Sequence, residues 1–208
     1  MTRFDQAYFD RLTEAVDEIE TKTSAEIVVA VSPRSGTYRD ADLLCGAGCA
    51  FLWLLFAVFN PWFVHPAWLL PIELGIVFGL GILTGFNISM LRRALTTGAR
   101  RDDQVRTAAA AQFVQDGVTS TRERTGVLIY VSRLEQQTEV IGDTGVLDRV
   151  DPTAWNERVF ALHKAASDND PAEALLRGLN HLGELLASAL PATDDNPDEI
   201  PNTPRVTQ

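Results

Sequence analysis

Two long apolar runs, separated by a short break, dominate the pattern of hydrophobic and polar positions. They cover Leu43–Phe59 and Ala67–Phe86, and the break contains proline. A helix rises about 1.5 Å per residue, so each run can cross, or nearly cross, a hydrocarbon core about 30 Å thick. Trp62 and Trp68 stand at the break, and tryptophan is enriched where a bilayer meets water. The pattern predicts a transmembrane helical hairpin over residues 43–86; a buried pair of core helices is the alternative.

Both flanks of the hairpin carry the shorter periodicities of an α-β domain. Helical spacing of apolar residues, or helix start and stop signals, predict helices over Phe4–Thr21, Asp102–Gly117, Thr153–Ala166 and Ala172–Leu190. Short β-branched runs predict buried strands over Ala25–Val31 and Gly126–Ser132, and a third strand returns over Gln137–Ile141. Residues 142–145 are predicted to form a turn. The soluble part is therefore an α-β domain that the hairpin divides in two.

The predicted domain organisation follows from this division. Residues 1–42 and 87–190 form the two parts of one domain, and residues 43–86 form the hairpin. Strands on both sides of the hairpin can share a sheet only if the chain returns to the same side of the membrane, which favours two spans. Residues 191–208 are acidic and Pro-rich, and we expect this tail to be disordered.

Arginines predict the orientation of the hairpin. The connecting loop Asn60–Pro66 has no Lys or Arg, whereas the flanks carry Arg34, Arg39, Arg92, Arg93, Arg100 and Arg101. Cytoplasmic flanks collect positive charge, and the N-terminus lacks the apolar core of a cleavable signal peptide. We expect a two-pass protein whose soluble domain and both termini lie in the cytoplasm.

The overall charge excludes some classes of partner. The chain has 208 residues, a formal net charge of -10 and a sequence pI of about 4.7. Nucleic acid binding requires a basic face, and we predict no nucleic acid partner. The same balance argues against docking of the domain itself on anionic lipid.

Small residues on the two predicted membrane helices indicate a close helix contact. Gly75 and Gly79, and likewise Gly81 and Gly85, have the spacing that lets helices approach closely. The first helix offers a matching small face, which includes Cys45 and Cys49. The two cysteines lie one turn apart on one face, where a disulfide is poorly placed. The hairpin either packs on itself through these faces or leaves a second small face free for a partner helix.

Glu73 is the unusual residue of the second apolar run. An acid inside a membrane is costly, and by default it indicates a functional site. It lies near the loop end of the run, where interfacial water is within reach. Structural or interfacial tolerance, contact with a partner, and proton or ion transfer are the three interpretations.

No catalytic constellation is evident, and we assign no catalytic residue. Asp143-Thr144-Gly145 matches the aspartic protease triplet, but that chemistry needs two such carboxylates, and the chain has one copy. The acids Asp143, Asp148 and Asp151 surround the turn after the third strand. Carboxylates on a loop can hold Ca²⁺, and a solvated acidic turn is the alternative.

Several of these segments together resemble the TPM-domain family, in particular a bacterial membrane branch with a two-helix hairpin inserted after the first strand. The resemblance rests on the strand Ser24–Ser32, the segment Thr121–Val146, Trp155 and the ending Glu199–Asn202. It implies a small α/β (α+β) sandwich, with a mixed sheet flanked by helices, in a bacterial inner membrane. It also implies roles in maintaining membrane complexes, and relatives have been credited with acid phosphatase activity and calcium binding.

We therefore expect a membrane-anchored accessory, assembly or maintenance protein of a larger membrane protein complex, photosynthetic or respiratory, acting by binding. The hairpin is expected to contact both the lipid bilayer and this complex. The alternatives are a metal-dependent acid phosphatase that uses Asp143 and neighbouring acids, and a Ca²⁺-responsive binding module.

Overall fold

A computed structural model describes residues 6–60, 66, 68–193, 200–202 and 204–206. The chain divides into two compact units. The first unit joins Met1–Ser35 to Asp102–Gln208, and we call it the sheet unit. The second unit covers Gly36–Arg101, and we call it the hairpin unit.

The sheet unit is built on one mixed sheet with the strand order β3-β2-β1-β4. Strand β1 (Glu26–Ser32) runs parallel to β2 (Gly126–Ser132), although the whole hairpin unit separates the two in sequence. Strand β3 (Gln137–Gly142) is antiparallel to β2, and the short β4 (Arg205–Val206) is parallel to β1. Every residue of β1 and β2 is buried, because helices cover both faces of the sheet.

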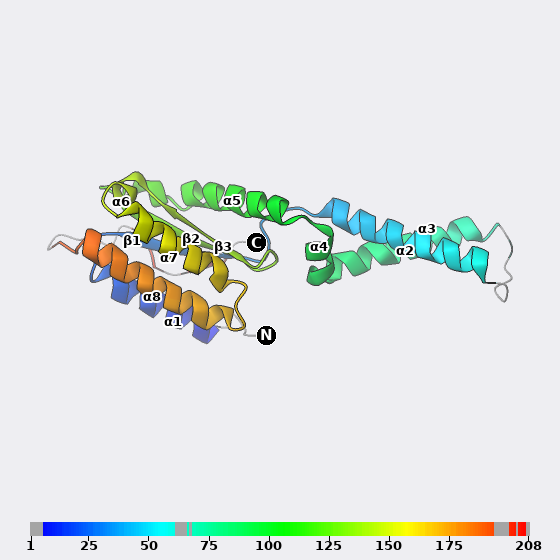
Figure 1. The fold of residues 1–208 in the computed structure, drawn as a ribbon, viewed down its shortest axis with the longest axis horizontal. Coiled ribbons are helices and arrows are strands. Elements are labelled where there is room, and N and C mark those ends of the chain that lie inside the picture. Colours follow the sequence, from blue (N-terminus) through cyan, green and yellow to red (C-terminus); the bar gives the residue numbers. More distant parts are fainter. Residues whose placement is uncertain (1–5, 61–65, 67, 194–199, 203, 207–208) are drawn as a thin grey trace. The chain divides into compact units, whose positions relative to one another are not determined.

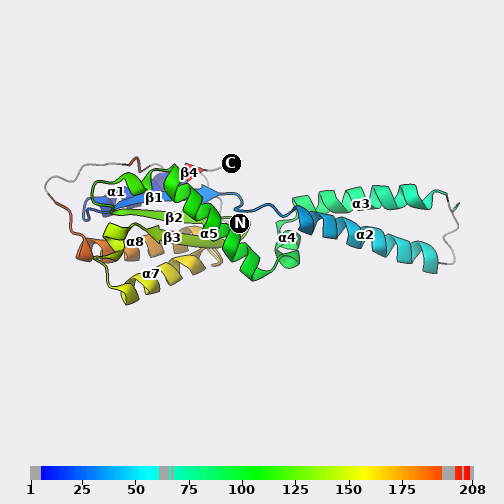
Figure 2. The same cartoon turned by 90° about the horizontal axis from the view of Figure 1, so that it is seen from above.

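Side chains alternate between two cores along the central strands. Helices α1 (Gln6–Glu20), α7 (Pro152–Ala165) and α8 (Pro171–Ala189) pack on one face of the sheet. Their core contains Leu12, Ile27, Val29, Ile129, Leu162 and Leu179. The core on the opposite face joins Val28, Leu128 and Tyr130 to Val105 and Ala109 of α5 (Gly98–Gln115). Figures 1 and 2 show this layering, which confirms the predicted α+β fold.

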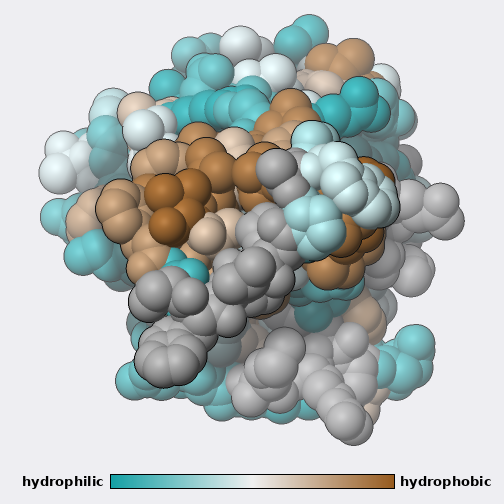
Figure 3. Space-filling model, turned by 90° about the vertical axis from the view of Figure 1, so that its right-hand side faces the viewer, coloured by the Kyte–Doolittle hydropathy of each residue, from teal (hydrophilic) through white to brown (hydrophobic). Residues whose placement is uncertain are grey.

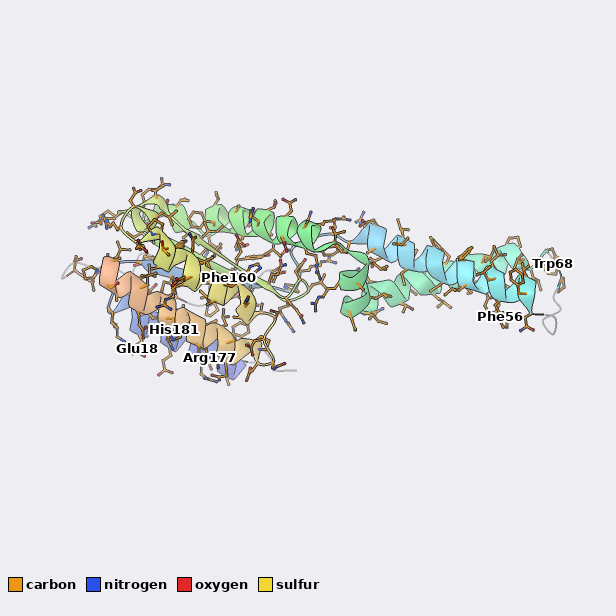
Figure 4. The ribbon with its side chains drawn as sticks, viewed as in Figure 1. Glu18, Phe56, Trp68, Phe160, Arg177 and His181 are labelled. Carbon is orange, nitrogen blue, oxygen red and sulfur yellow. The ribbon has the colours of Figure 1, made fainter. Side chains whose placement is uncertain are left out.

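The hairpin unit consists of α2 (Arg39–Phe59), α3 (Leu70–Asn87) and the short α4 (Ser89–Leu95). Helices α2 and α3 are long and apolar enough to cross a membrane. Only 11% of the most apolar stretch of each helix is buried, whereas a pair of soluble core helices would be mostly buried. Figure 3 shows hydrophobic side chains gathered on the hairpin surface that faces the viewer. Phe56 and Trp68, labelled in Figure 4, are 45% and 69% exposed.

The boundaries of these units differ from the prediction. The hairpin unit begins after Ser35 and ends at Arg101, rather than covering residues 43–86, because flanking segments pack with the two long helices. The sequence analysis missed α4 altogether. The predicted turn at residues 142–145 contains the start of a short helix, α6 (Thr144–Leu147). The predicted hairpin connection lies largely outside the described residues, as does Trp62.

The prediction of a wholly disordered tail after residue 190 is wrong for its described part. Pro191 bridges to Thr23, and Ile200 is buried in the α5 core. The Ile200 amide donates to Glu26 Oε2 at 3.3 Å. Strand β4 then pairs with Ala30 and Val31 of β1, so the end of the chain completes the edge of the sheet.

Gly126 allows the start of β2 to lie against η1 (Val118–Ser120). A Cβ at this position would lie 2.2 Å from the carbonyl oxygen of Val118, which is far inside van der Waals contact. We expect Gly126→Ala to lower the free energy of unfolding by roughly 3 kcal/mol, because the backbone itself must move. Gly98→Ala is the control, since its Cβ would meet only Arg101 Nη2 at 3.9 Å. Equal denaturation midpoints for the two variants in detergent would contradict this account.

Candidate functional site

The inner face of the hairpin is built from its smallest residues. A Cβ on Gly81 would lie 2.8 Å from the Gly46 Cα and 3.0 Å from the Cys49 Cβ. A Cβ on Gly85 would lie 3.1 Å from the Cys45 Cβ. The two cysteines are free thiols at the contact between the helices. The pair Gly81 and Gly85 therefore lets α2 and α3 pack on each other.

The other glycine pair is not used inside the hairpin. A Cβ on Gly75 or Gly79 of α3, or on Gly48 of α2, would meet no atom of the described residues within 4 Å, apart from the backbone of its own helix. Gly75 and Gly79 lie one helical turn apart, so they share one face. The two interpretations of the small residues thus apply to different pairs. Gly81 and Gly85 form the contact between α2 and α3, and Gly75 and Gly79 take no part in that contact.

Glu73 has a contact within the hairpin. It lies in the first turn of α3, where the positive end of the helix dipole favours a carboxylate. Its Oε2 accepts a hydrogen bond from Trp53 Nε1 of α2 at 3.2 Å, and the Trp53 and Phe56 rings pack 5.5 Å apart. Glu73 therefore joins the loop ends of α2 and α3, as the tolerance interpretation expects.

A buried ion pair closes the opposite end of the hairpin. Arg92 Nε and Nη2 donate to the two carboxylate oxygens of Asp42 at 2.7 and 2.6 Å, and both side chains are 9% exposed. The Arg92 guanidinium also lies 4.7 Å from the centre of the Phe86 ring. The hydrogen bonds that Arg92 donates to Asp42 raise the pKa of Arg92, against the effect of burial. Sequence reasoning missed this pair, although an acid opening one span and a basic residue following the next is a usable signal.

Nearby, Arg100 binds both carboxylate oxygens of Asp40 at a more exposed position. The first turn of α2 therefore contributes two carboxylates, and each one pairs with an arginine that follows α3. Both pairs lie inside the hairpin unit.

The acidic turn after β3 is a structural junction. Asp143 is 4% exposed and accepts hydrogen bonds from Arg124 Nε at 3.1 Å and Nη2 at 3.0 Å, and from the Thr144 amide at 2.7 Å. Arg124 has a φ of 58°, and its carbonyl accepts from the Gly145 amide at 3.0 Å. A Cβ on Gly145 would lie 2.2 Å from the Glu123 carbonyl oxygen, so only glycine fits there.

The structure does not assemble the predicted calcium site. Asp143 is engaged by Arg124, and Asp151 accepts from the Ala154 amide at 2.9 Å as the N-cap of α7. Asp148 is exposed. Across the part of the chain that the structure describes, no group of three or more His, Cys, Asp or Glu side chains could hold a metal ion. Asp143 and Asp151 instead cap the helices α6 and α7, and Asp143 also neutralises Arg124.

Hydroxyl groups gather where the two parallel strands end together. Ser32 and Ser132 are opposite each other in the β1–β2 register. Ser35 Oγ lies 2.7 Å from Ser132 Oγ and 3.2 Å from the Tyr130 hydroxyl, and Ser132 donates to Glu135. Glu135 is only 2% exposed, and its Oε1 accepts from the Ser35 amide at 3.0 Å. A buried carboxylate thus ties the two strand-end loops together.

An open cleft lies against this cluster. Its volume is about 420 Å³, and its lining comprises Ser32, Arg34, Ser35, Ala108, Ala111, Gln112, Gln115 and Tyr130. Ligands of open α/β sheets bind at the carboxyl ends of parallel strands, and the cleft has the size of a small-molecule site. Sequence reasoning missed it because its residues come from three distant segments. Ser32, directly after the first predicted strand, and Ser132, at the end of the second, were the available signal.

Comparisons with known proteins give a likeness of fold. No protein-family model matches the chain, and no curated protein matches its sequence. The chain is similar to the NMR structure of the BA42 protein from the psychrophilic bacterium Bizionia argentinensis, with a TM-score of 0.61 and 18% sequence identity. The alignment covers 100% of this chain and 98% of that one. At this identity the similarity establishes a shared fold alone.

The buried ion pair yields the first test of the hairpin. Asp42→Asn leaves the Arg92 charge buried without its carboxylate, and we expect the free energy of unfolding in detergent to fall by about 3–5 kcal/mol. Asp40→Asn is the matched control, because that carboxylate is 58% exposed and exposed pairs contribute about 0–1 kcal/mol. A loss no larger for Asp42→Asn than for Asp40→Asn would refute the assigned role.

The cluster of Ser32, Ser35, Ser132 and Glu135 at the ends of β1 and β2, which we call the strand-end cluster, yields a second test. Glu135→Ala leaves the Ser35 amide and the Ser132 hydroxyl without their acceptor, so the loop after β1 should open more readily. We expect amide exchange in a peptide containing Ser35 to accelerate roughly tenfold, as measured by mass spectrometry. Glu157→Ala, at an exposed position on α7, should leave that exchange unchanged. Unaltered exchange in Glu135→Ala would mean that other contacts hold the loop.

Proposed function

We propose that this protein is a two-pass membrane protein that acts by binding, as an accessory, assembly or maintenance subunit of a larger membrane protein complex. The observation that carries the proposal is the open pair Gly75 and Gly79. The hairpin meets its own packing needs through Gly46, Gly81 and Gly85, so the second small face is available to another helix.

The composition of the hairpin surface supports a membrane location. Large apolar side chains on α2 and α3 are more than half exposed; they include Leu43, Leu44, Phe51, Leu52, Ile72, Ile76, Leu80 and Leu83. Their exposure to water would be unfavourable, and contiguous apolar surface of this kind is typical of a membrane or an interface. Within a membrane, close packing drives helix association, and small residues permit the approach.

Strand pairing supports the proposed topology. β1 precedes the hairpin, β2 follows it, and the two pair along seven residues from Glu26↔Gly126 to Ser32↔Ser132. A sheet cannot continue through a bilayer, so a chain whose hairpin crosses the membrane has both flanks on one side. The flanking arginines favour the cytoplasmic side. We propose the inner membrane of a bacterium, with both termini in the cytoplasm.

The architecture also supports membership of the TPM-domain family. A mixed sheet with helices on both faces is the fold that the sequence resemblance implies. The resemblance is carried by the segment Thr121–Val146, in which Arg124 donates a hydrogen bond to Asp143. The same segment contains Gly126 and Gly145, where a Cβ would clash with the backbone. These residues have structural reasons for their identities.

The phosphatase alternative receives less support at its proposed residue. The Asp143 carboxylate is bound by Arg124 and by the first turn of α6. The strand-end cleft favours a different second candidate, a domain that binds a small polar ligand. Ser35, Gln112 and Gln115 offer hydroxyl and amide groups, and Arg34 offers a positive charge, to such a ligand.

The deciding experiment is gentle extraction of the tagged protein from its native membrane, followed by size-exclusion chromatography and mass identification of co-eluting proteins. We expect a stoichiometric larger complex for the wild type. Gly79→Leu should reduce the partner roughly tenfold or more, because a large side chain blocks close approach of a helix. Its melting temperature should stay near that of the wild type, since a Cβ on Gly79 would meet no atom of another described element within 4 Å.

Two further variants separate loss of the partner from loss of the fold. Gly81→Leu should disrupt the hairpin itself, because its Cβ would already lie 2.8 Å from Gly46. Leu83→Phe adds bulk at an exposed apolar position and should change neither property. A wild type that elutes alone at the size of its own micelle, or a Gly79→Leu variant that keeps the complex, would overturn the proposal.

A further inference from the structure

The segment that runs from α4 into the first turn of α5, residues 90–101, has the composition of a membrane-surface segment. We call it the elbow. Helix α4 begins two residues after α3 ends, so it directly follows the second apolar helix. Met90 and Leu95 are 79% and 39% exposed, and they lie on either side of Arg92 and Arg93. Exposed apolar residues beside arginines are typical of helices that lie at the level of lipid headgroups.

Two of the four arginines in this region have no carboxylate partner among the described residues. Arg92 is paired with Asp42, and Arg100 with Asp40. Arg93 and Arg101 form no ion pair with any residue that the structure describes, and the Nε of each is buried without a hydrogen-bond partner. Burial first, and then the positive charge of Arg101, lower the pKa of Arg93. The fold therefore holds two like charges close together without supplying the anion that would stabilise them.

The Thr96 hydroxyl is a further unsatisfied donor in this segment. Thr96, which connects the two helices, is only 7% exposed, and its hydroxyl has no partner among the described residues. Arg101 Nη2 lies 3.9 Å from where a Cβ on Gly98 would be, so its guanidinium folds back over the first turn of α5. Amides in a first helical turn have no intrahelical acceptor and carry the positive end of the dipole.

We propose that Arg93, Thr96 and Arg101 bind the phosphate of an anionic phospholipid headgroup at the membrane surface. A phosphate accepts hydrogen bonds from guanidinium, hydroxyl and amide donors alike. Its negative charge offsets the positive charges of Arg93 and Arg101. A headgroup is favoured over a phosphate in solution because the elbow follows the span directly and exposes Met90 and Leu95. The inference rests on the proposed membrane location of the hairpin, and it adds a specific lipid contact to it.

The test compares lipid retention in nanodiscs made of phosphatidylcholine with a minor fraction of phosphatidylglycerol. Native mass spectrometry counts the lipids that leave the disc with the full-length protein. The wild type should retain phosphatidylglycerol over phosphatidylcholine by roughly tenfold or more relative to the disc composition, since each arginine near the surface adds to the attraction. Arg93→Gln with Arg101→Gln should retain both lipids near the disc ratio.

Two control proteins separate the change in charge from its position and from the substitution itself. Arg106→Gln with Arg177→Gln removes two exposed arginines of the sheet unit; Figure 4 shows Arg177 on α8. This control should keep the wild-type preference. Arg93→Lys with Arg101→Lys keeps the charge and should keep most of the preference, and it identifies any effect of the substitutions on folding.

Each other outcome has a defined meaning. Equal retention of phosphatidylglycerol by the wild type and the Gln double variant would overturn the site. Thermal stabilisation by inorganic phosphate in pure phosphatidylcholine discs, equal to that by phosphatidylglycerol, would overturn the lipid assignment in favour of a soluble phosphate. Failure of the wild type to enter discs would overturn the membrane location itself, a result distinct from insertion without lipid preference.

Discussion

The parallel pairing of β1 with β2 is the constraint on which the rest of the structure depends. The two strands are the centre of the sheet, they separate the two cores, and their seven-residue register brings Ser32 level with Ser132. The segment between them must leave the sheet unit and return to it. A closed helical hairpin satisfies this demand, and the pair Asp42 and Arg92 joins its outgoing and returning chains. The strand-end cleft follows from the same register, because both strands stop at one edge.

Local pattern predicted the elements well where burial decides them. Gly126–Ser132 was predicted with its true ends, because a β-branched run bounded by glycine and a polar loop leaves little choice. Strand β4 could not be predicted, since two residues in a polar tail form a strand only because the exposed edge of β1 accepts them. Helix α4 is short, and its apolar residues are exposed, so it has no periodicity to detect.

The functional residues were harder to predict because their partners are remote in sequence. Asp143 was one candidate metal ligand by sequence, and in the structure Arg124, from another loop, donates hydrogen bonds to it. The two glycine pairs of α3 have the same spacing, and only the contact with α2 distinguishes the pair that is used from the pair that is open. The strand-end cleft joins three segments that no local pattern connects. For Asp143 and the glycines of α3 the sequence indicated the residues of interest, and their roles depended on tertiary contacts.

The insertion of the hairpin between β1 and β2 also imposes an order on biogenesis. When β1 leaves the ribosome, the strand that will pair with it has not been made, and both α2 and α3 must follow first. An unpaired apolar strand is prone to associate with other chains, and such long-range pairing is slow to form. The two long helices are therefore synthesised before the central pair of the sheet can form. A ribosome that stalls within α3 would leave a chain with β1 still unpaired.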